Sequence, residues 1–207
     1  MSKKLTYFGV HGRTRPCRML LDHAKVKYED CRVTPEIFAE LKTSKGITGL
    51  PIWEEGNGMC MNESKALLRY LATCNGYYPK DPVTAWKADC IVDKFCTDIL
   101  NHWVPKMSAK DMDPAAFKAG MEMIVKRLSE DLTHGKKYLC GDKISVADFA
   151  AFGILSSWSL NPHWAYKDSC ADGAMEAFNS SPSFKAWMDN MMMENKAHLE
   201  ASPAAPY

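Results

Sequence analysis

The sequence predicts a small α/β domain followed by a larger all-helical domain. Up to Gly76, short strand-like and helix-like segments alternate in the order βαβαββα. Beyond Gly76, every long segment has the periodicity of an amphipathic helix. The segment "GYYPKDP", rich in glycine and proline, separates the two patterns and reads as a linker. We therefore predict one domain over residues 1–78 and a second over 79–207.

The elements of the first domain follow from local patterns. Residues 5–8 predict a strand, and Pro16 suits the first turn of a helix with one apolar face. Residues 28–33 predict a second strand and 35–43 a second, short helix. "GLPIW" and "GMCM" flank the turn "EEGN", which is typical of a β-hairpin. "NESKALLRYLA" then predicts a helix that begins with Asn62 as its cap.

The second domain is predicted from five segments of helical periodicity. "ISVADFAAFGIL" contains Ser145 and Asp148 at capping-box spacing before an almost wholly apolar run, which indicates a buried structural helix. The predicted helices cover residues 83–108, 114–135, 145–158, 171–179 and 183–196.

Composition excludes several classes of function. The 26 basic and 25 acidic residues give a net charge of +1 and are spread along the chain, so no basic face favours nucleic acid or an anionic membrane. No apolar run suggests a signal peptide or a membrane span, and we expect a cytoplasmic protein. The eight cysteines contain no C-x-x-C pair, and the histidines have no metal-ligand spacing, so we expect no metal site.

Three features could carry chemistry, and each has a structural alternative. Tyr7, near the end of the first predicted strand, is either a core aromatic or a hydroxyl aimed at a substrate. Leu50-Pro51 fits a trans proline at a sheet edge, which the pattern alone favours, or a cis bond that presents the Leu50 backbone to a ligand. Glu63 and Ser64 fit ordinary helix capping, or a site for the ammonium and carboxylate of an amino acid.

Taken together, these motifs resemble the cytosolic glutathione S-transferases nearly end to end. The matching segments are "YFGVHGRTR", "ELKTSKGITGLPIW", "NESKALLRYLA", "YYP" and "GDKISVADFAAF". Their spacing looks most like the sigma class, with the mu class next. The resemblance implies a thioredoxin-like N-terminal domain, a helical C-terminal domain and a homodimer. It also implies glutathione as co-substrate, a hydrophobic electrophile, a role in detoxification and no prosthetic group.

The resemblance also assigns roles to single residues. Tyr7 is expected to donate a hydrogen bond to glutathione sulfur and favour the thiolate, with Arg13 adding positive charge. The residues expected to contact glutathione are Tyr7, Phe38, Lys42, Gly49, Leu50, Pro51, Glu63 and Ser64. The residues expected around the electrophile are Val10, Gly12, Trp103 and Tyr207.

The chain departs from the family pattern at several positions. Phe38 stands where sigma members commonly have tryptophan, and Gly49 where a glutamine is common, which implies weaker or rearranged contacts with glutathione. Relatives use an aspartate on the fourth helix to reach the partner subunit's glutathione. Thr97 falls at that position, with Asp98 and Asp93 nearby.

Two other functions stay open. A crystallin-like structural or ligand-binding relative would keep the fold and lose turnover, although "KMSAKDMDPAAFK" lacks the insertion common in such crystallins. A sigma-type prostaglandin isomerase or peroxidase would keep the tyrosine. An oxidoreductase that uses Cys17 ranks lower, because that cysteine falls inside the first helix.

Overall fold

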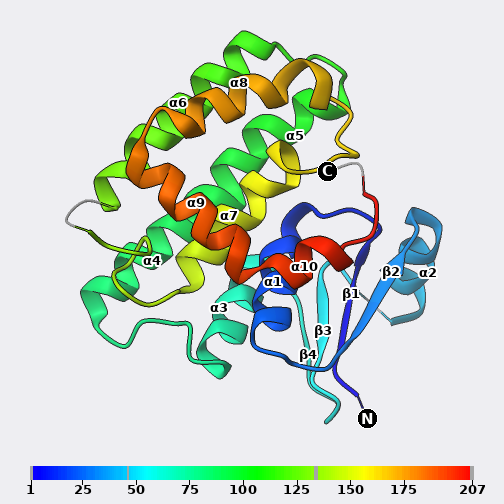
Figure 1. The fold of residues 1–207 in the computed structure, drawn as a ribbon. Coiled ribbons are helices and arrows are strands. Elements are labelled where there is room, and N and C mark those ends of the chain that lie inside the picture. Colours follow the sequence, from blue (N-terminus) through cyan, green and yellow to red (C-terminus); the bar gives the residue numbers. More distant parts are fainter. Residues whose placement is uncertain (1, 46, 133–134, 206–207) are drawn as a thin grey trace.

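The computed structural model describes residues 2–45, 47–132 and 135–205. Its N-terminal part contains a four-stranded sheet of order β2-β1-β3-β4 (Figure 1). Strand β1 runs parallel to β2 and antiparallel to β3, and β3 pairs with β4 as a hairpin. The strands are β1 Lys4–Phe8, β2 Glu29–Val33, β3 Ile52–Glu54 and β4 Cys60–Met61. The predicted order of strands and helices along the chain, βαβαββα, is confirmed, and with it the α/β class of this part.

Three helices accompany the sheet: α1 Arg15–His23, α2 Pro35–Lys45 and α3 Ser64–Cys74. Helices α1 and α3 lie between the sheet and the C-terminal helices, whereas α2 lies at the outer edge beside β2 (Figure 1). The apolar face predicted for the first helix is fully buried at Cys17, Leu20 and Leu21. This burial fixes α1 against the rest of the molecule, and the start of α1 is where the candidate site lies.

The C-terminal part is helical, as predicted. Helix α7 is its centre, because every residue from Val146 to Trp158 is buried. The predicted capping box is present: the Asp148 carboxylate accepts from the Ser145 N–H at 2.9 Å and from the Trp187 Nε1–H at 2.9 Å. The helices are α4 Pro82–Asp93, α5 Leu100–Ser108, α6 Pro114–Asp131, α7 Val146–Ser159, α8 Lys167–Asn179, α9 Pro182–Glu194 and α10 Lys196–Ala201.

Several predicted boundaries are wrong. The helix expected over 83–108 contains a π-helical turn, Lys94–Ile99, between α4 and α5. Helix α8 begins four residues before the expected residue 171, and α10 was not expected. A six-residue helix such as α10 is too short to show a period. The helix expected to reach residue 135 ends at Asp131, and residues 133–134 lie outside the described residues.

Helix α1 packs closely on α7, and this contact positions the loop that precedes α1. A Cβ on Gly153 of α7 would lie only 2.9 Å from Pro16 Cγ and 3.0 Å from the Pro16 backbone nitrogen. Only glycine allows this approach without a shift of one helix. In the described part of the chain, no helix has the length and apolar character that crossing a membrane requires.

Candidate functional site

The Tyr7 hydroxyl lies against the loop that joins β1 to α1. The side chain is 8% exposed, and its Oη accepts from the Arg13 backbone N–H over 3.4 Å. Gly12 has φ +44°, and a Cβ there would lie 3.0 Å from Tyr7 Oη. The Arg18 guanidinium carbon is 5.9 Å from the centroid of the Tyr7 ring. Glycine at position 12 therefore leaves room for the hydroxyl at the start of α1.

The Arg13 side chain ties this loop to the C-terminal helices. Its Nη1 donates to the Cys96 carbonyl at 2.9 Å, and its Nη2 donates to Asn101 Oδ1 at 2.7 Å. Cys96 belongs to the π-helical turn, a feature that is frequent at functional sites. Arg13 therefore holds the loop beside Tyr7 against the α4–α5 segment and keeps a positive charge near it.

The Leu50-Pro51 peptide bond is cis. The pattern alone favours a trans proline at an edge, and that interpretation is wrong; the cis alternative is confirmed. Pro51 is buried and immediately precedes β3, whereas Leu50 and Gly49 are half-buried. The backbone of Leu50 thus lies at the end of the central sheet.

Glu63 has φ 68° and ψ 98°, a conformation that is costly for a residue with a side chain. It is the residue before α3, and its side chain makes no capping hydrogen bond. Asn62 is therefore not the cap, and ordinary capping does not explain Glu63. Unusual backbone conformations of this kind cluster at functional sites. Ser64 follows as the first residue of α3, where the first backbone N–H groups of a helix have no partner within the helix.

Phe38 and Lys42 of α2 connect to Tyr7 through a row of aromatic rings. The Phe8 ring centroid is 5.6 Å from that of Tyr7 and 5.5 Å from that of Phe38, both edge-on. The Lys42 ammonium lies 4.5 Å from the centroid of Phe38. The Phe38 ring thus holds a cation over its face, which favours a negatively charged ligand at this edge.

Cys17 is poorly suited to act as a nucleophile. It is fully buried, its Sγ faces the Ser64 carbonyl at 4.0 Å, and burial raises the pKa of its thiol. A thiolate is the reactive form of cysteine, and this environment disfavours it. The oxidoreductase alternative therefore loses its nucleophile.

Trp103 lies away from the row of rings. It is 4% exposed, its ring centroid is 4.9 Å from that of Phe117, and a Cβ on Gly120 would lie 2.7 Å from Cζ2 of its ring. It lines a groove of about 710 Å³ between the α4–α5 segment and α6, and no residue of the β1–α1 loop lines that groove. Val10 is half-buried in that loop. Tyr207 lies outside the described residues.

The three candidates on the fourth helix differ in their surroundings. Asp93 binds Lys65 and Arg69 of α3, at 3.1 Å in each case. Asp98 binds Lys94 at 3.2 Å and lines the groove. The buried hydroxyl of Thr97 has no hydrogen-bond partner in the described part of the chain. Asp93 is thus the one that lies beside the helix that begins at Ser64.

Sequence reasoning missed two residues that shape this site. Arg18 lies over the Tyr7 ring and also donates to the Val10 carbonyl at 2.9 Å. Asn101 accepts from Arg13. Neither belongs to a local motif, so only the folded arrangement reveals them. Among the described residues, no group of three or more His, Cys, Asp or Glu could hold a metal ion.

Two protein-family models match this chain and show the family to which it belongs. The model for "Glutathione S-transferase, N-terminal domain" matches residues 3–73, and the model for "Glutathione S-transferase, C-terminal domain" matches residues 91–195. The chain belongs to the glutathione S-transferase family. It is 28% identical to "Glutathione S-transferase P" of Caenorhabditis elegans, covering 91% of this chain and 93% of that protein.

Two other relatives in this family have different names. The chain is 30% identical to hematopoietic prostaglandin D synthase of Gallus gallus (89% of this chain, 94% of that protein). It is 34% identical to S-crystallin SL11 of Nototodarus sloanii (75% and 80%). Its fold matches the crystal structure of a monomeric glutathione S-transferase of Necator americanus with a TM-score of 0.82, at 22% identity over 100% of both chains.

Proposed function

We propose that this glutathione S-transferase family member activates glutathione through Tyr7 and conjugates it to hydrophobic electrophiles. The observation that supports this most strongly is the place of the Tyr7 hydroxyl, at the start of α1 beside Gly12 and the Arg13 N–H. A helix N-terminus favours negative charge. A thiolate bound there gains from the helix dipole, from the Tyr7 O–H and from the nearby Arg13 charge.

The chemistry requires a phenol that donates and a thiol that ionises. A free thiol has a pKa of about 8.5, so most of it is protonated at neutral pH. A phenol keeps its proton there and donates a hydrogen bond to the sulfur, which stabilises the thiolate and lowers the thiol pKa. The thiol proton leaves to solvent. The thiolate then forms a carbon–sulfur bond to the electrophile, and with a chloronitrobenzene a chloride ion leaves.

Several residues are proposed to hold the rest of glutathione. The Leu50 backbone, beside the cis Pro51, pairs with the cysteinyl peptide group. Glu63 and Ser64 take the ammonium and carboxylate of the γ-glutamyl end, and the costly backbone of Glu63 supports this assignment. Lys42, over Phe38, faces the glycyl carboxylate. Asp93, bound to Lys65 and Arg69 near the start of α3, is the helix-four residue that we favour for a role at this end.

The electrophile is proposed to bind beside Tyr7, against Val10 and Gly12, with Tyr207 from the end of the chain. Trp103 faces α6 and the groove, so we assign it a packing role there. A sigma-like speciality, such as prostaglandin isomerisation or peroxide reduction, would use the same thiolate. The prostaglandin synthase relative supports testing those substrates.

The test is turnover of glutathione with 1-chloro-2,4-dinitrobenzene. Tyr7→Phe should lower kcat by about 10- to 100-fold, because a hydrogen bond to a charged group contributes about 1.5–3 kcal/mol. Tyr166→Phe is the matched control: it also removes one phenol, whose hydroxyl bonds the Met107 carbonyl in the helical part, and should keep full activity. Cys17→Ser should also stay active. Unchanged kcat in Tyr7→Phe contradicts the proposed mechanism.

A crystallin-like role is the second candidate, favoured by the S-crystallin relative. It predicts that the wild-type protein binds glutathione, measured by calorimetry, and shows no turnover with chloronitrobenzenes, peroxides or a prostaglandin endoperoxide. Turnover that depends on Tyr7 excludes it.

We also propose a homodimer in the cytoplasm, built through α4 and α6. These helices expose Val83, Trp86 and Met123, each between 66% and 70% accessible, and apolar side chains this exposed favour an interface. Light scattering after size-exclusion chromatography should give twice the chain mass of 23.3 kDa. Trp86→Glu should shift it to the monomer, and a monomeric wild type at micromolar concentration contradicts the dimer.

A further inference from the structure

Two neutral acceptors hold the Arg13 guanidinium. Its Nη1 donates to the Cys96 carbonyl at 2.9 Å, and its Nη2 donates to Asn101 Oδ1 at 2.7 Å. The planar fork of an arginine also suits a carboxylate, which would bind it through opposite charge. A carboxylate would, however, offset the positive charge that Arg13 presents to other groups. A carbonyl and an amide fix the same guanidinium and leave its charge in place.

The first acceptor depends on the π-helical turn Lys94–Ile99. In a regular α-helix, the N–H of Leu100 would donate to the carbonyl four residues earlier, which is that of Cys96. The Leu100 N–H donates to the Thr97 carbonyl instead. The Cys96 carbonyl is thus released from that helical hydrogen bond, and Arg13 donates to it from the β1–α1 loop. The π-helical turn therefore supplies an acceptor that a regular helix would use internally.

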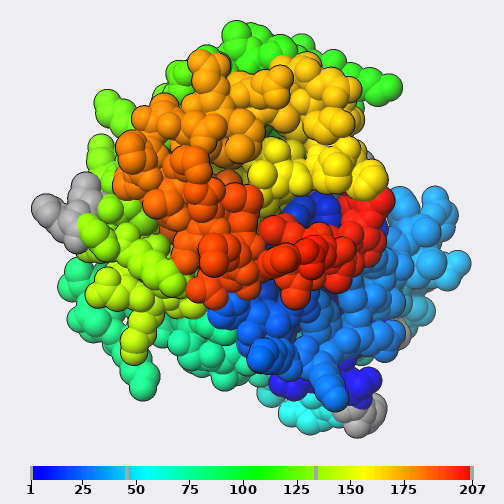
Figure 2. Space-filling model, viewed as in Figure 1, coloured from blue at the N-terminus to red at the C-terminus, as the bar shows by residue number. Residues whose placement is uncertain are grey.

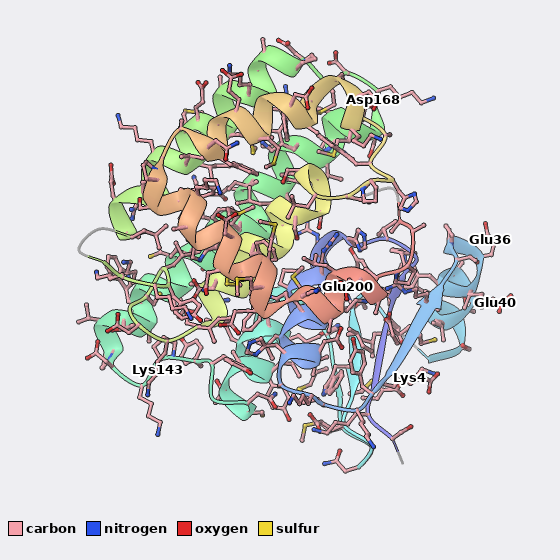
Figure 3. All side chains as sticks on the ribbon, in the orientation of Figure 1. Lys4, Glu36, Glu40, Lys143, Asp168 and Glu200 are labelled. Carbon is pink, nitrogen blue, oxygen red and sulfur yellow. The ribbon has the colours of Figure 1, made fainter. Side chains whose placement is uncertain are left out.

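The two acids closest to Asn101 along the chain bind other cations. Asp98, on the π-helical turn, accepts from Lys94 at 3.2 Å. Asp93 binds Arg69 of α3 at 3.1 Å. The acids labelled on α2 in Figure 3 lie at the outer edge of the molecule, and they are Glu36 and Glu40. The acids nearest to the amide acceptor in the chain thus already have partners of their own.

Neighbouring groups at the β1–α1 loop do not cancel the Arg13 charge either. Arg18, which lies over the Tyr7 ring, carries its own counter-charge, because Asp30 binds it at 3.0 Å. His11 is 3% exposed. Burial, together with the charges of Arg15 and Arg18, lowers the pKa of His11 to about 3. The imidazole is therefore neutral at pH 7.

Other contacts hold the N-terminal part of the chain to the C-terminal helices. In Figure 2 the red α10 lies against the blue N-terminal part, and Asp22 of α1 binds His198 of α10 at 2.6 Å. His23 Nε2 lies 3.3 Å from a carboxylate oxygen of Glu194 in α9. Helix α1 also packs on α7 through the bare backbone of Gly153. A change at Asn101 should therefore leave the fold in place and act locally on Arg13.

We infer that Asn101 is a positioning residue for glutathione activation, which fixes the Arg13 guanidinium without cancelling its charge. The inference rests on the proposed function. Arg13 is half-buried, so a guanidinium that loses one of its two bonds can turn toward water, which weakens its field. Held by a neutral amide, the charge stays at one place and favours a thiolate beside Tyr7. A carboxylate at position 101 would hold the guanidinium and remove that benefit.

The pKa of the bound glutathione thiol tests this role, read from thiolate absorbance against pH at saturating glutathione. Asn101→Asp keeps the shape and an acceptor oxygen, and should raise the thiol pKa by at least about 0.3 units, a roughly twofold smaller ionisation constant. Asn101→Ala removes the acceptor and should raise it by a similar amount. Near neutral pH, kcat should fall about twofold in both variants. The KM for glutathione should stay within about twofold, because Lys42, Leu50 and Glu63 are proposed to hold the molecule.

Two controls separate positioning from a general effect of charge or fold. His102→Asp puts the same charge on the next residue of α5, which is exposed and lines the groove beside α6. It should shift the thiol pKa less than half as much as Asn101→Asp. In the Arg13→Met background, Asn101→Ala should add less than about 0.1 units, because a positioning residue has no effect without the group that it positions.

The inference is overturned if the thiol pKa in either Asn101 variant equals that of the wild type. It is also overturned if His102→Asp shifts the pKa as much as Asn101→Asp does, or if Asn101→Ala acts equally with and without Arg13. Each of these outcomes leaves the proposed function standing, provided that Tyr7→Phe raises the thiol pKa. A wild-type thiol pKa equal to that of free glutathione would refute both.

Discussion

Replacing Gly12 by alanine should damage catalysis more than the fold. The new Cβ would lie 3.0 Å from Tyr7 Oη, so the hydroxyl must move by a few tenths of an ångström. A misplacement of about 1 Å can cost roughly 100-fold in rate, so a shift of this size should lower kcat roughly fourfold. The φ of +44° adds a stability cost of about 1–2 kcal/mol for a residue with a side chain. That cost corresponds to a melting temperature lower by roughly 2–8 °C.

The measurement is kcat with glutathione and a chloronitrobenzene, well below the melting temperature, together with a thermal melt. Gly9→Ala is the matched control in the same loop, because a Cβ there meets no heavy atom within 4 Å. It should keep wild-type kcat. If Gly12→Ala also keeps wild-type kcat, the closeness of Gly12 to the hydroxyl has no bearing on catalysis, and the account of this loop is refuted.

Three further predictions concern the same region. Arg13→Met should lower the free energy of unfolding, measured in urea, by about 1–2 kcal/mol. In a double-mutant cycle with Asn101→Ala, the two effects should not add, because the two side chains share one hydrogen bond. If the double variant loses the sum of the two single losses, the Arg13–Asn101 hydrogen bond does not contribute to stability. Gly153→Ala should cost at least about 2 kcal/mol in the same assay, because its Cβ meets the Pro16 backbone at 3.0 Å, and a neutral effect refutes the tight packing of α1 on α7. The folded-state pKa of His11, about 3, lies below the ordinary 6.5, so the unfolded chain binds the proton first and stability falls as pH drops from about 6.5 towards 3. This histidine should contribute up to about 1.4 kcal/mol per pH unit, and His11→Gln should flatten the profile; an unchanged slope contradicts the burial argument.

Elements defined by local chemistry could be predicted from the sequence. The α7 helix follows from its apolar run and from Ser145 and Asp148, whose capping box is present in the structure. The βαβ unit and the hairpin follow from alternating patterns and a glycine-rich turn. In each case the deciding interactions lie within a few residues of one another along the chain.

Features that depend on distant contacts could not be predicted in the same way. The π-helical turn at Lys94–Ile99 looks like ordinary helix in the sequence, and its Cys96 carbonyl is bonded by Arg13, more than eighty residues earlier. The left-handed backbone of Glu63 has no local signal, since glycine or asparagine is the usual residue for such a conformation. The place of Trp103 likewise depends on the bare backbone of Gly120 in another helix.

The candidate site likewise contains residues that the sequence marks and contacts that only the folded chain creates. Tyr7, Leu50-Pro51 and Glu63-Ser64 stand out because family motifs mark them. The contacts that shape their surroundings, Arg18 over the tyrosine ring and Asn101 on Arg13, come from packing between distant segments.

The central claim, that the Tyr7 hydroxyl stabilises the glutathione thiolate, is tested most directly by the pKa of the bound thiol. Difference absorbance of the thiolate, followed against pH with saturating glutathione, measures this pKa in the wild type and in Tyr7→Phe. The account predicts a wild-type value about 1–2 units below that in Tyr7→Phe, from a charge-assisted hydrogen bond of about 1.5–3 kcal/mol. Equal pKa values in the two proteins, with glutathione bound equally well, would contradict it.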